Sequence, residues 1–475
     1  MEDIIIIGGG VIGAFVARYL SRYKTSILVL DKETDVGDVT SMANSAIGHS
    51  GYDPVPGTKK AYFNVKGNKM YPEVCKQLDV HFDMCGSLTV ALDDKQFAML
   101  GDLKKRAEQN GVETKLLTGE EVKAMEPNVS QDVKGALLCP TAGVVNPFTL
   151  TVHAMENAVD NGAKLQLGCE VLGIDKTEKG YVVHTNLGDY EARLVINCAG
   201  LFSDKIAAMI EDIDWSIRPR KGEYYVLDHY AKGLVNHVLF PLPSEKGKGI
   251  LVTMTTSGNY LVGPSSEWVD DKEDYATDTL TLANVKAQAT MMVPNIPFRE
   301  QIRVFSGLRA TPSTHDFIIE KSHKYDTFVN VAGIESPGLA SSPAIGQYVA
   351  DELVAPTLGL ELKEQWNPCV KPYVKPADME LEERNALIAK NPHFGKMVCN
   401  CEKVSLGEIE DALSRSVPPH TIKALKKRTR AGFGKCQGGF CQPQVLLLLA
   451  EHYGISPLDV LYDKEGSNIL EGVSK

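Results

Sequence analysis

The start of the chain, residues 1–31, places the strongest constraint on the fold. Residues 4–7 are consecutive isoleucines typical of a buried strand, and residues 14–23 have the pattern of a helix. Between them, Gly8, Gly10 and Gly13 give the spacing G-x-G-x-x-G in the context that it requires. Such a turn lets a pyrophosphate lie against bare backbone at the positive end of a helix. The sequence therefore predicts a Rossmann-like dinucleotide-binding fold of the α/β class.

A single dinucleotide is expected, because no second turn of comparable quality follows. The next strand, residues 26–30, ends at Asp31, which is placed to accept hydrogen bonds from a ribose. An apolar strand over residues 194–198 leads into Ala199 and Gly200. Strand ends of this kind return the chain to the same cofactor. The glycine-rich turn alone does not show whether that cofactor is FAD or NAD.

Four cysteines near the C-terminus predict a metal site. Cys399 and Cys401 form a C-x-C pair, and Cys436 and Cys441 form a C-x4-C pair after a long gap. Thiolates paired in this way can hold an iron–sulfur cluster or tetrahedral zinc. The tight C-x-C pair fits a zinc ribbon poorly, so the cluster is favoured over zinc and over ordinary buried thiols.

The run around these cysteines resembles the small [2Fe-2S] domain related to bacterioferritin-associated ferredoxin, over residues 396–460. That resemblance implies a [2Fe-2S] cluster held by all four thiolates. Gly434, Gly438 and Gly439 suit it, because backbone N–H groups can approach cluster sulfurs where no Cβ intervenes. Residues 420–435 hold six basic residues and no acid, which indicates a solvated helix face, a docking surface for an acidic partner, or compensation of the cluster's negative charge.

The region 45–51, with the glycine-rich turn and the later strand ends, resembles the D-amino-acid oxidase superfamily of flavoproteins over residues 1–370. Within it, the match is to the branch of FAD-dependent glycerol-3-phosphate oxidases and dehydrogenases and L-2-hydroxyglutarate dehydrogenases. The resemblance implies FAD as the cofactor. The residues expected to contact it are Gly8, Gly10, Gly13, Asp31, Ser45, Ala199, Gly200, Gly338 and Leu339.

Four residues are expected to act on the substrate. His49 matches the active-site histidine of the glycerol-3-phosphate oxidases, and an imidazole with a pKa of about 6.5 can accept a proton at cellular pH. Arg309 matches the family arginine that faces the substrate anion, and its planar fork suits phosphate and carboxylate alike. Lys248 and Ser336 match a lysine near the active site and a residue set against the flavin. Each could instead have an ordinary structural role. Tyr224 and Lys221, in the stretch 218–225, are also expected on the substrate side without an assigned role, unless that stretch is an exposed strand.

The resemblance implies a dehydrogenase that oxidises sn-glycerol 3-phosphate to dihydroxyacetone phosphate. His49 would take the C2 hydroxyl proton, Arg309 would hold the phosphate, and hydride would pass to the flavin. The cluster would be superfluous if oxygen reoxidised the flavin directly, so electrons are expected to reach a partner flavoprotein or iron–sulfur subunit in a hetero-oligomer. L-2-hydroxyglutarate oxidation, a non-catalytic electron-transfer subunit and, more weakly, amine oxidation remain alternatives.

The composition fits a large enzyme, with 475 residues, 43% hydrophobic and 23% charged. We expect a discontinuous FAD-dependent domain over residues 1–370 with an inserted β-rich substrate domain, a linker over 371–395, a small helical [2Fe-2S] domain over 396–460 and a tail over 461–475. Residues 82–92 and 224–240 should be strands of the inserted domain, while 58–78 and 146–161 should be helices.

Charge and hydropathy narrow the partners and the location. A net charge of −11 argues against general nucleic-acid binding. The sequence contains no run of 18 apolar residues, so no transmembrane segment is predicted. The first residues lack the features of a signal peptide. Ten cysteines without regular pairing outside the C-terminal set fit a reducing compartment. We therefore expect a cytoplasmic protein, with peripheral attachment to a membrane through a partner left open.

Overall fold

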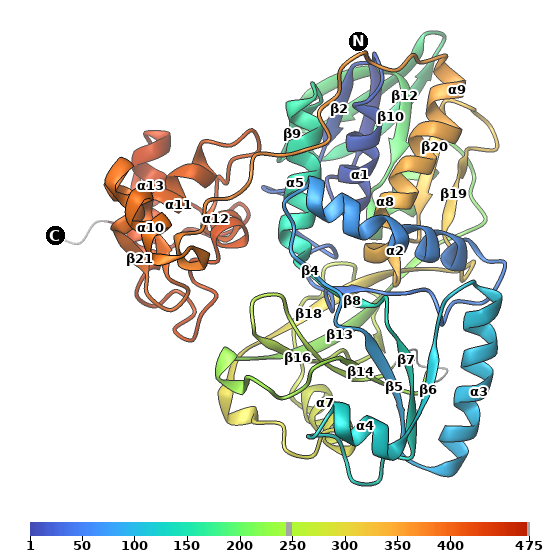
Figure 1. Ribbon diagram of the computed structural model, residues 1–475. Helices are drawn as coiled ribbons and strands as arrows, with labels where there is room; N and C mark the ends of the chain where they lie inside the picture. Colours follow the sequence, from blue (N-terminus) through green and yellow to red (C-terminus); the bar gives the residue numbers. More distant parts are fainter. Residues whose placement is uncertain (244–248, 473–475) are drawn as a thin grey trace.

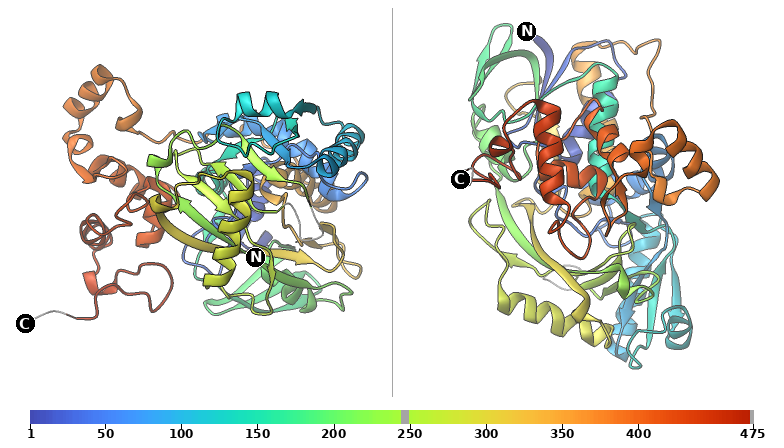
Figure 2. Two further views of the ribbon diagram at one scale, coloured as in Figure 1. Left: turned by 90° about the horizontal axis from the view of Figure 1, so that it is seen from below. Right: turned by 90° about the vertical axis from the view of Figure 1, so that its left-hand side faces the viewer.

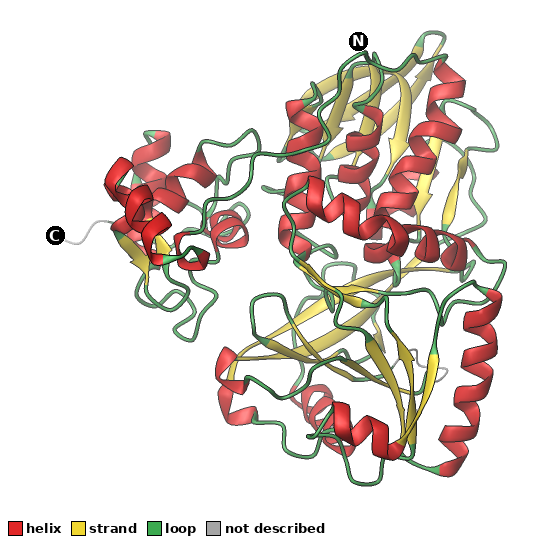
Figure 3. Ribbon diagram, in the orientation of Figure 1, coloured by secondary structure: helices red, strands yellow, loops and turns green. Residues whose placement is uncertain are grey.

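Two large sheets and a small helical unit make up the computed structural model, which describes residues 1–243 and 249–472 (Figure 1). The first sheet and its helices lie at one end, the second sheet lies at the other, and the helical unit stands to one side. Figure 3 shows that helices and strands are mixed throughout the two larger parts. The predicted α/β class, with a β-rich part beside a Rossmann-like part and a helical C-terminal unit, is confirmed.

The first sheet has the strand order β10-β11-β12-β1-β2-β9, with β20 beside β12 and β19 beside β20. Its centre is parallel, because β1 pairs with both β2 and β12 in that sense. The carboxyl ends of the parallel strands therefore meet at one edge, where α/β folds bind their ligands. The strands are β1 (Glu2–Ile7), β2 (Ile27–Leu30), β9 (Lys164–Gln166), β10 (Val171–Thr177), β11 (Gly180–Thr185), β12 (Gly188–Asn197), β19 (Ile318–Lys321) and β20 (Phe328–Ala332).

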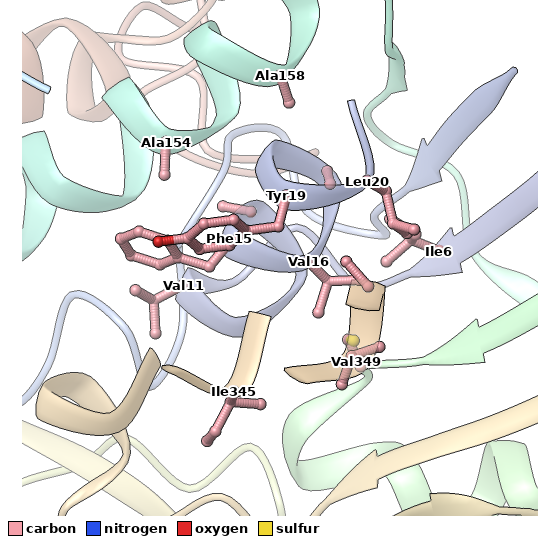
Figure 4. Packing of buried hydrophobic residues seen from close by; sticks show 14 of the residues in the cluster. Ile6, Val11, Phe15, Val16, Tyr19, Leu20, Ala154, Ala158, Ile345 and Val349 are labelled. Carbon is pink, nitrogen blue, oxygen red and sulfur yellow. The ribbon is translucent and has the colours of Figure 1, made fainter. Parts of the chain in front are cut away.

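Strand β1 is buried on both faces, which explains its unbroken apolar run. Ile4 and Ile6 face one cluster with the helix that follows, whereas Ile5 and Ile7 face another. Figure 4 shows how closely Phe15 and Val16 of that helix pack against neighbouring helices. The helices of this part are α1 (Val11–Leu20), α2 (Lys59–Gln77), α5 (Pro147–Asp160), α6 (Ser203–Ala208), α8 (Gly338–Tyr348) and α9 (Ala355–Leu358).

The second sheet is mixed and has the order β17-β13-β16-β15-β14-β5-β7-β6, with β18 also paired to β13. The long β13–β18 pair is antiparallel and places Arg220 directly opposite Arg309. The strands are β5 (Ser87–Ala91), β6 (Lys115–Thr118), β7 (Gly135–Cys139), β13 (Ile217–Leu227), β14 (Val238–Pro241), β15 (Leu251–Met254), β16 (Tyr260–Gly263), β17 (Glu267–Trp268) and β18 (Gln301–Pro312), and the helices are α3 (Asp94–Gln109), α4 (Gly119–Met125) and α7 (Thr279–Met292).

Two predicted strands are each divided in the structure. Residues 82–92 form β4 (Phe82–Asp83) and then β5, because Gly86 turns the chain with φ +77°. β4 belongs to a small sheet with β3 (Ile47–Gly48) and β8 (Gly143–Val145), which joins the two large parts. Residues 224–240 likewise contain the end of β13 and, after a short 3-10 turn, β14 (Val238–Pro241). The predicted helices over 58–78 and 146–161 are confirmed as α2 and α5.

The C-terminal unit, residues 381–472, is mostly helical and folds around its own apolar cluster. Helix α12 packs against α5 of the first part, and Figure 2 shows the unit beside the rest of the molecule from two further directions. Its elements are α10 (Leu381–Lys390), β21 (Met397–Cys399), β22 (Val404–Ser405), α11 (Leu406–Leu413), α12 (Ile422–Thr429) and α13 (Gln442–Tyr453).

Candidate functional site

The turn between β1 and α1 has room only for glycine at two positions. Gly8 has φ +109°, and a Cβ there would lie 2.4 Å from the carbonyl oxygen of Cys198. A Cβ on Gly13 would lie 1.9 Å from the carbonyl oxygen of Gly8. Gly10 caps α1 without a side-chain hydrogen bond. The turn therefore presents bare backbone at the positive end of a helix, which suits the pyrophosphate of a dinucleotide.

Residues 31–46, called segment 31–46 below, run from the end of β2 across this turn. The Asp31 carboxylate accepts a hydrogen bond from the backbone N–H of Gly9, and Gly37 N–H donates to the Gly9 carbonyl over 3.0 Å. Ser41 Oγ accepts from Val11 N–H over 2.9 Å. Burial raises the pKa of Asp31 to about 6, against the lowering effect of backbone hydrogen bonds. Asp31 is thus anchored to the turn. Its contact with a ribose stays a prediction.

A cavity of about 620 Å³ opens beside this turn, between the first sheet and the second. We call it the substrate-side cavity. Its size is in the range of small-molecule and cofactor sites. Eight predicted site residues line it: Gly10, Ser45, His49, Gly200, Arg309, Ser336, Gly338 and Leu339. Four others, Gly8, Gly13, Asp31 and Ala199, lie outside its lining. The structure thus brings residues from five distant stretches of sequence to one hollow.

His49 follows the short strand β3 and is buried, with 9% of its surface exposed. Its ring lies 5.7 Å from the ring of Phe240, measured between centroids, and its carbonyl oxygen accepts a hydrogen bond of 2.6 Å from Asn64 Nδ2. The Phe82 ring packs closely on the backbone before His49, since a Cβ on Gly48 would lie 2.9 Å from that ring. The imidazole therefore stands at the cavity wall on a backbone that the neighbouring side chains hold in place.

Arg309 enters the cavity from β18 as a partly buried cation. Its Nη2 lies 3.3 Å from the Ser265 carbonyl oxygen, and its Nη1 lies 3.5 Å from the Arg220 carbonyl oxygen. Among the described residues, no carboxylate lies within 4.0 Å of it. Burial lowers its pKa, while Tyr224, which is also in hydrogen-bond contact with it, raises it. An arginine whose neighbours are carbonyl oxygens and a tyrosine hydroxyl group can accept an anionic ligand without giving up an ion pair.

A buried carboxylate that the sequence analysis did not single out lies at the same cavity. Glu335 accepts hydrogen bonds of 2.8 Å from Lys60 Nζ, Arg220 Nη2 and Thr311 Oγ1. These ion pairs outweigh burial and keep the pKa of Glu335 below its usual value. Glu335 precedes Ser336 in the chain, so the three donors tie the turn before α8 to α2, β13 and β18. Nothing in the sequence signals this network, because its members are far apart along the chain.

Two lysines, Lys248 and Lys221, were expected near the substrate. Lys248 lies outside the described residues. Lys221, which was expected on the substrate side together with Tyr224, points the other way and pairs with Asp274 over 2.8 Å. Neighbouring residues of a strand face opposite sides of the sheet, so Arg220 and Tyr224 line the cavity and Lys221 does not. The hydroxyl oxygen of Tyr224 lies 3.1 Å from Ser45 Oγ.

The four C-terminal cysteines come together in two pairs. Cys401 Sγ lies 3.7 Å from Cys436 Sγ, and the thiols of Cys399 and Cys441 are in hydrogen-bond contact. Among the described residues, no three His, Cys, Asp or Glu side chains converge on a point that could hold a single metal ion. Two pairs of thiols suit a two-iron cluster better than one tetrahedral zinc ion.

The backbone around these thiols also fits a cluster. Gly434 leaves no space for a side chain, because a Cβ there would lie 2.4 Å from the Cβ of Cys401. Burial raises the pKa of Cys436, but backbone hydrogen bonds, from the N–H groups of residues 438–440, outweigh it and bring the pKa below its usual value. N–H groups directed at a sulfur favour the thiolate, which is the form that binds iron.

The basic stretch of residues 420–435 is not a solvated helix face. Lys427 and Arg428 of α12 are buried and pair with Asp35, with N–O distances of 2.7 and 2.8 Å. Lys423 reaches Asp38 over 3.3 Å. Both aspartates belong to segment 31–46, so the stretch holds the C-terminal unit against the dinucleotide turn. Of the three interpretations of this stretch, the solvated helix face does not hold for α12, because helix periodicity does not show which partner covers a face.

Comparisons with known proteins agree with both sites. The model of the family "FAD dependent oxidoreductase" matches residues 3–352, and that of the "BFD-like [2Fe-2S] binding domain" matches residues 397–451. The chain is 44% identical to the glycerol 3-phosphate dehydrogenase of Caloramator mitchellensis, over 100% of this chain and 99% of that one. It is 30% identical to the L-2-hydroxyglutarate dehydrogenase of Escherichia coli, over 58% of this chain and 66% of that one.

A solved structure is also similar. The L-alpha-glycerophosphate oxidase from Mycoplasma pneumoniae, with FAD bound, superposes with a TM-score of 0.73 and 28% identity, covering 78% of this chain and 99% of that one. Within the described residues, no helix is both long enough and apolar enough to cross a membrane.

Proposed function

The chain belongs to the family of FAD-dependent oxidoreductases and carries a BFD-like [2Fe-2S] domain, and from this premise we propose that it oxidises sn-glycerol 3-phosphate to dihydroxyacetone phosphate. The observation that carries the proposal is a partly exposed arginine, Arg309, that shares one cavity with His49 and has no carboxylate partner among the described residues. The full-length similarity to a glycerol 3-phosphate dehydrogenase supports the same substrate.

Two cofactors would supply the electron chemistry when bound: FAD would supply hydride acceptance from a carbon that bears a hydroxyl group, and the [2Fe-2S] cluster would supply one-electron transfer. Gly8, Gly10, Gly13 and Asp31 would hold the dinucleotide, with Gly338 and Leu339 at the opposite wall of the cavity. Cys399, Cys401, Cys436 and Cys441 would hold the cluster.

The chain's own residues would then bind the substrate and move its proton. Arg309 holds the phosphate through charge-assisted hydrogen bonds, which the guanidinium can make in pairs. His49 accepts the proton of the C2 hydroxyl group as the C–H bond breaks, so the alcohol becomes a ketone. Ser336 and Ser45 line the same cavity and have hydroxyl groups that can orient the substrate.

The charge of the cavity supports an anionic substrate. Lys60, Arg220 and Arg309 bring three positive charges to the single carboxylate of Glu335. Arg106, Asp53 and Glu267 also line the cavity, so its charged side chains have a net charge of about +1, which attracts a phosphate monoester.

The electrons are proposed to leave through the cluster to a partner flavoprotein or iron–sulfur protein in a hetero-oligomer. Cys401 is exposed and Cys436 is partly exposed, whereas Cys399 and Cys441 are buried. One side of the cysteine site therefore faces solvent, and an acceptor protein could approach the cluster there.

A second candidate substrate is L-2-hydroxyglutarate, which the similarity to the Escherichia coli enzyme favours. Its carboxylates would also bind Arg309, and its hydroxyl group has the same relation to the flavin. One arginine does not distinguish the two acids.

The test is an anaerobic titration of the purified holoprotein with each substrate in separate samples. Fast bleaching of the flavin band by glycerol 3-phosphate, with a change in the cluster absorbance, is the expected result. Bleaching by L-2-hydroxyglutarate alone would contradict glycerol 3-phosphate as the substrate and support the second candidate. No bleaching by either acid would contradict both and favour an electron-transfer subunit.

The role of His49 is tested by His49→Ala. Loss of a general base lowers the rate of flavin reduction by about 100- to 10,000-fold. Substrate binding should change little, because Arg309 is intact. His184→Gln, on the exposed hairpin of β11, is the control and should reduce at the normal rate. An unchanged reduction rate in His49→Ala would remove the assignment.

A further inference from the structure

The six basic residues of α12 and the loop after it differ in their partners. Five of them have an acidic neighbour. The pairs are Lys423 with Asp38 and Asp463, Lys427 with Asp35 and Asp38, Arg428 with Asp35, Arg430 with Glu402, and Lys435 with Glu300. Only the sixth, Lys426, has no carboxylate within 4.0 Å among the described residues.

Lys426 is nevertheless buried, with 5% of its surface exposed. Its Nζ lies over the ring of Phe433, 4.6 Å from the centroid. Its stem passes the loop that carries two of the cysteines, because a Cβ on Gly432 would lie 3.7 Å from Lys426 Cδ and 3.6 Å from Gly438 Cα. A buried ammonium group with an aromatic ring beside it and no carboxylate within 4.0 Å is costly unless a negative charge lies nearby.

The cysteine site provides that negative charge. Lys426 interacts electrostatically with two cations, Arg303 and Arg430, which oppose its charge. It also interacts with Cys441 and Cys399, which favour its charge and are both buried. A [2Fe-2S] cluster on four thiolates is negatively charged and gains one further negative charge when it is reduced. Net charge and solvent exposure are among the properties that set the potential of such a cluster.

We propose that Lys426 is the counter-charge of the [2Fe-2S] cluster and that it raises the cluster's reduction potential. The buried ammonium stabilises the reduced cluster more than the oxidised one, because attraction grows with the charge of the cluster and little water screens it. One electron enters the cluster and no bond forms or breaks at Lys426. The inference depends on the cluster and not on the substrate, so it can fail or succeed independently of the proposed reaction.

The position of Lys426 suits a charge that favours electron transfer from the flavin to the cluster. It lines a second cavity of about 590 Å³ that is enclosed by all three parts of the molecule. Ala43, Asn44 and Ala46 line this cavity and the substrate-side cavity as well. Lys426 therefore lies on the cluster's side of the space that separates the cluster from the flavin site, where a higher cluster potential favours electron transfer from the flavin.

The experiment is a dye-mediated redox titration of the holoprotein, in which the reduced cluster is followed by electron paramagnetic resonance. Lys426→Met keeps the stem and removes the charge. It should lower the equilibrium constant for cluster reduction at least tenfold, which is about 59 mV for one electron. Lys426→Arg should keep the wild-type potential. Lys435→Met is the matched control: that cation precedes Cys436 but has 61% of its side chain exposed, so water screens it.

A potential that is unchanged in Lys426→Met, or that shifts no more than in Lys435→Met, would overturn the proposal. An anion held in the second cavity would produce this result. Lys426→Gln repeats the test if the methionine variant does not assemble its cluster. Loss of the cluster in both neutral variants but not in Lys426→Arg would support the role of the charge, whereas loss in all three would assign Lys426 to packing alone.

Discussion

Arg309 can cross the neighbouring strand only because the residue beside it is glycine. A Cβ on Gly222 of β13 would lie 2.8 Å from Arg309 Nη2 and 2.7 Å from Pro264 Cβ. The arginine was predicted from its motif, through the resemblance of that motif to the family. The glycine was not predictable as its partner, because strand register decides which residues face each other across a sheet.

We expect Arg309→Met to lower kcat/KM for glycerol 3-phosphate by roughly 30- to 1,000-fold, which corresponds to about 2–4 kcal/mol of lost charge-assisted hydrogen bonding. Steady-state kinetics with an artificial electron acceptor would measure it. Arg299→Met is the matched control, because that side chain is 88% exposed and lies far from the cavity lining. Equal kinetics in the two variants would contradict the assignment of Arg309.

Glu335 shows what the sequence hides at the residue scale. It stands beside the predicted Ser336, yet its importance comes from Lys60 and Arg220, which approach from other elements. Motifs identify residues that lie close together in the sequence. A carboxylate that joins distant elements becomes visible only when the fold brings its donors together.

At the scale of elements, the strand–turn–helix unit at the N-terminus was predictable almost completely. The observed bounds of β1 and α1 differ from the expected ones by a few residues only, because α1 already begins at Val11. Sterics in the turn explain why the glycine spacing is so informative: two of its glycines face backbone carbonyl oxygens at distances that no side chain tolerates. Such a pattern reflects geometry and not composition.

Gly13→Ala should destabilise the protein by about 1–3 kcal/mol and reduce the FAD that copurifies with it, because the new Cβ would overlap a backbone carbonyl group. Gly101→Ala makes the same change in α3, where nothing lies within 4 Å, and should stabilise by about 0.5–1 kcal/mol. Thermal unfolding and the flavin content per protein would measure both. A normal flavin content in Gly13→Ala would argue against a dinucleotide at this turn.

At the scale of the whole molecule, the parts could be predicted but their docking could not. The α/β class and the small helical unit followed from local patterns and from family resemblance. The contact between α12 and segment 31–46 did not, since six cations within residues 420–435 indicate a charged surface equally well. Only the structure shows Arg428 fully buried against Asp35, with two N–O distances of 2.8 Å.

We expect Asp35→Asn to weaken the attachment of the C-terminal unit by about 3–5 kcal/mol, because Arg428 would stay buried without a carboxylate partner and Lys427 would keep only Asp38. Hydrogen exchange of α12 amides would report the loss. Asp102→Asn breaks only an exposed pair with Lys105 and should cost less than about 0.5 kcal/mol. Equal protection of α12 in the two variants would contradict the structural role of Asp35.

The same contact should weaken in acid. Although burial raises the pKa of Asp35, Arg428 and Lys427 bring it well below its usual range. A carboxyl group whose pKa is depressed by folding contributes its full stability above its unfolded pKa of about 3.9 and loses it as the pH falls further. Protection of α12 in wild type should therefore be constant from pH 7 to about pH 5 and decline below pH 4.

Segment 31–46 touches the dinucleotide turn, lines the substrate-side cavity and anchors α12 through buried ion pairs. A carrier domain on a loose tether has to swing between a loading and an unloading position, and thick solvents slow that movement. In this molecule the cluster is already held beside the part of the chain that receives the electrons first. Its internal electron transfer should therefore have a rate that does not depend on solvent viscosity.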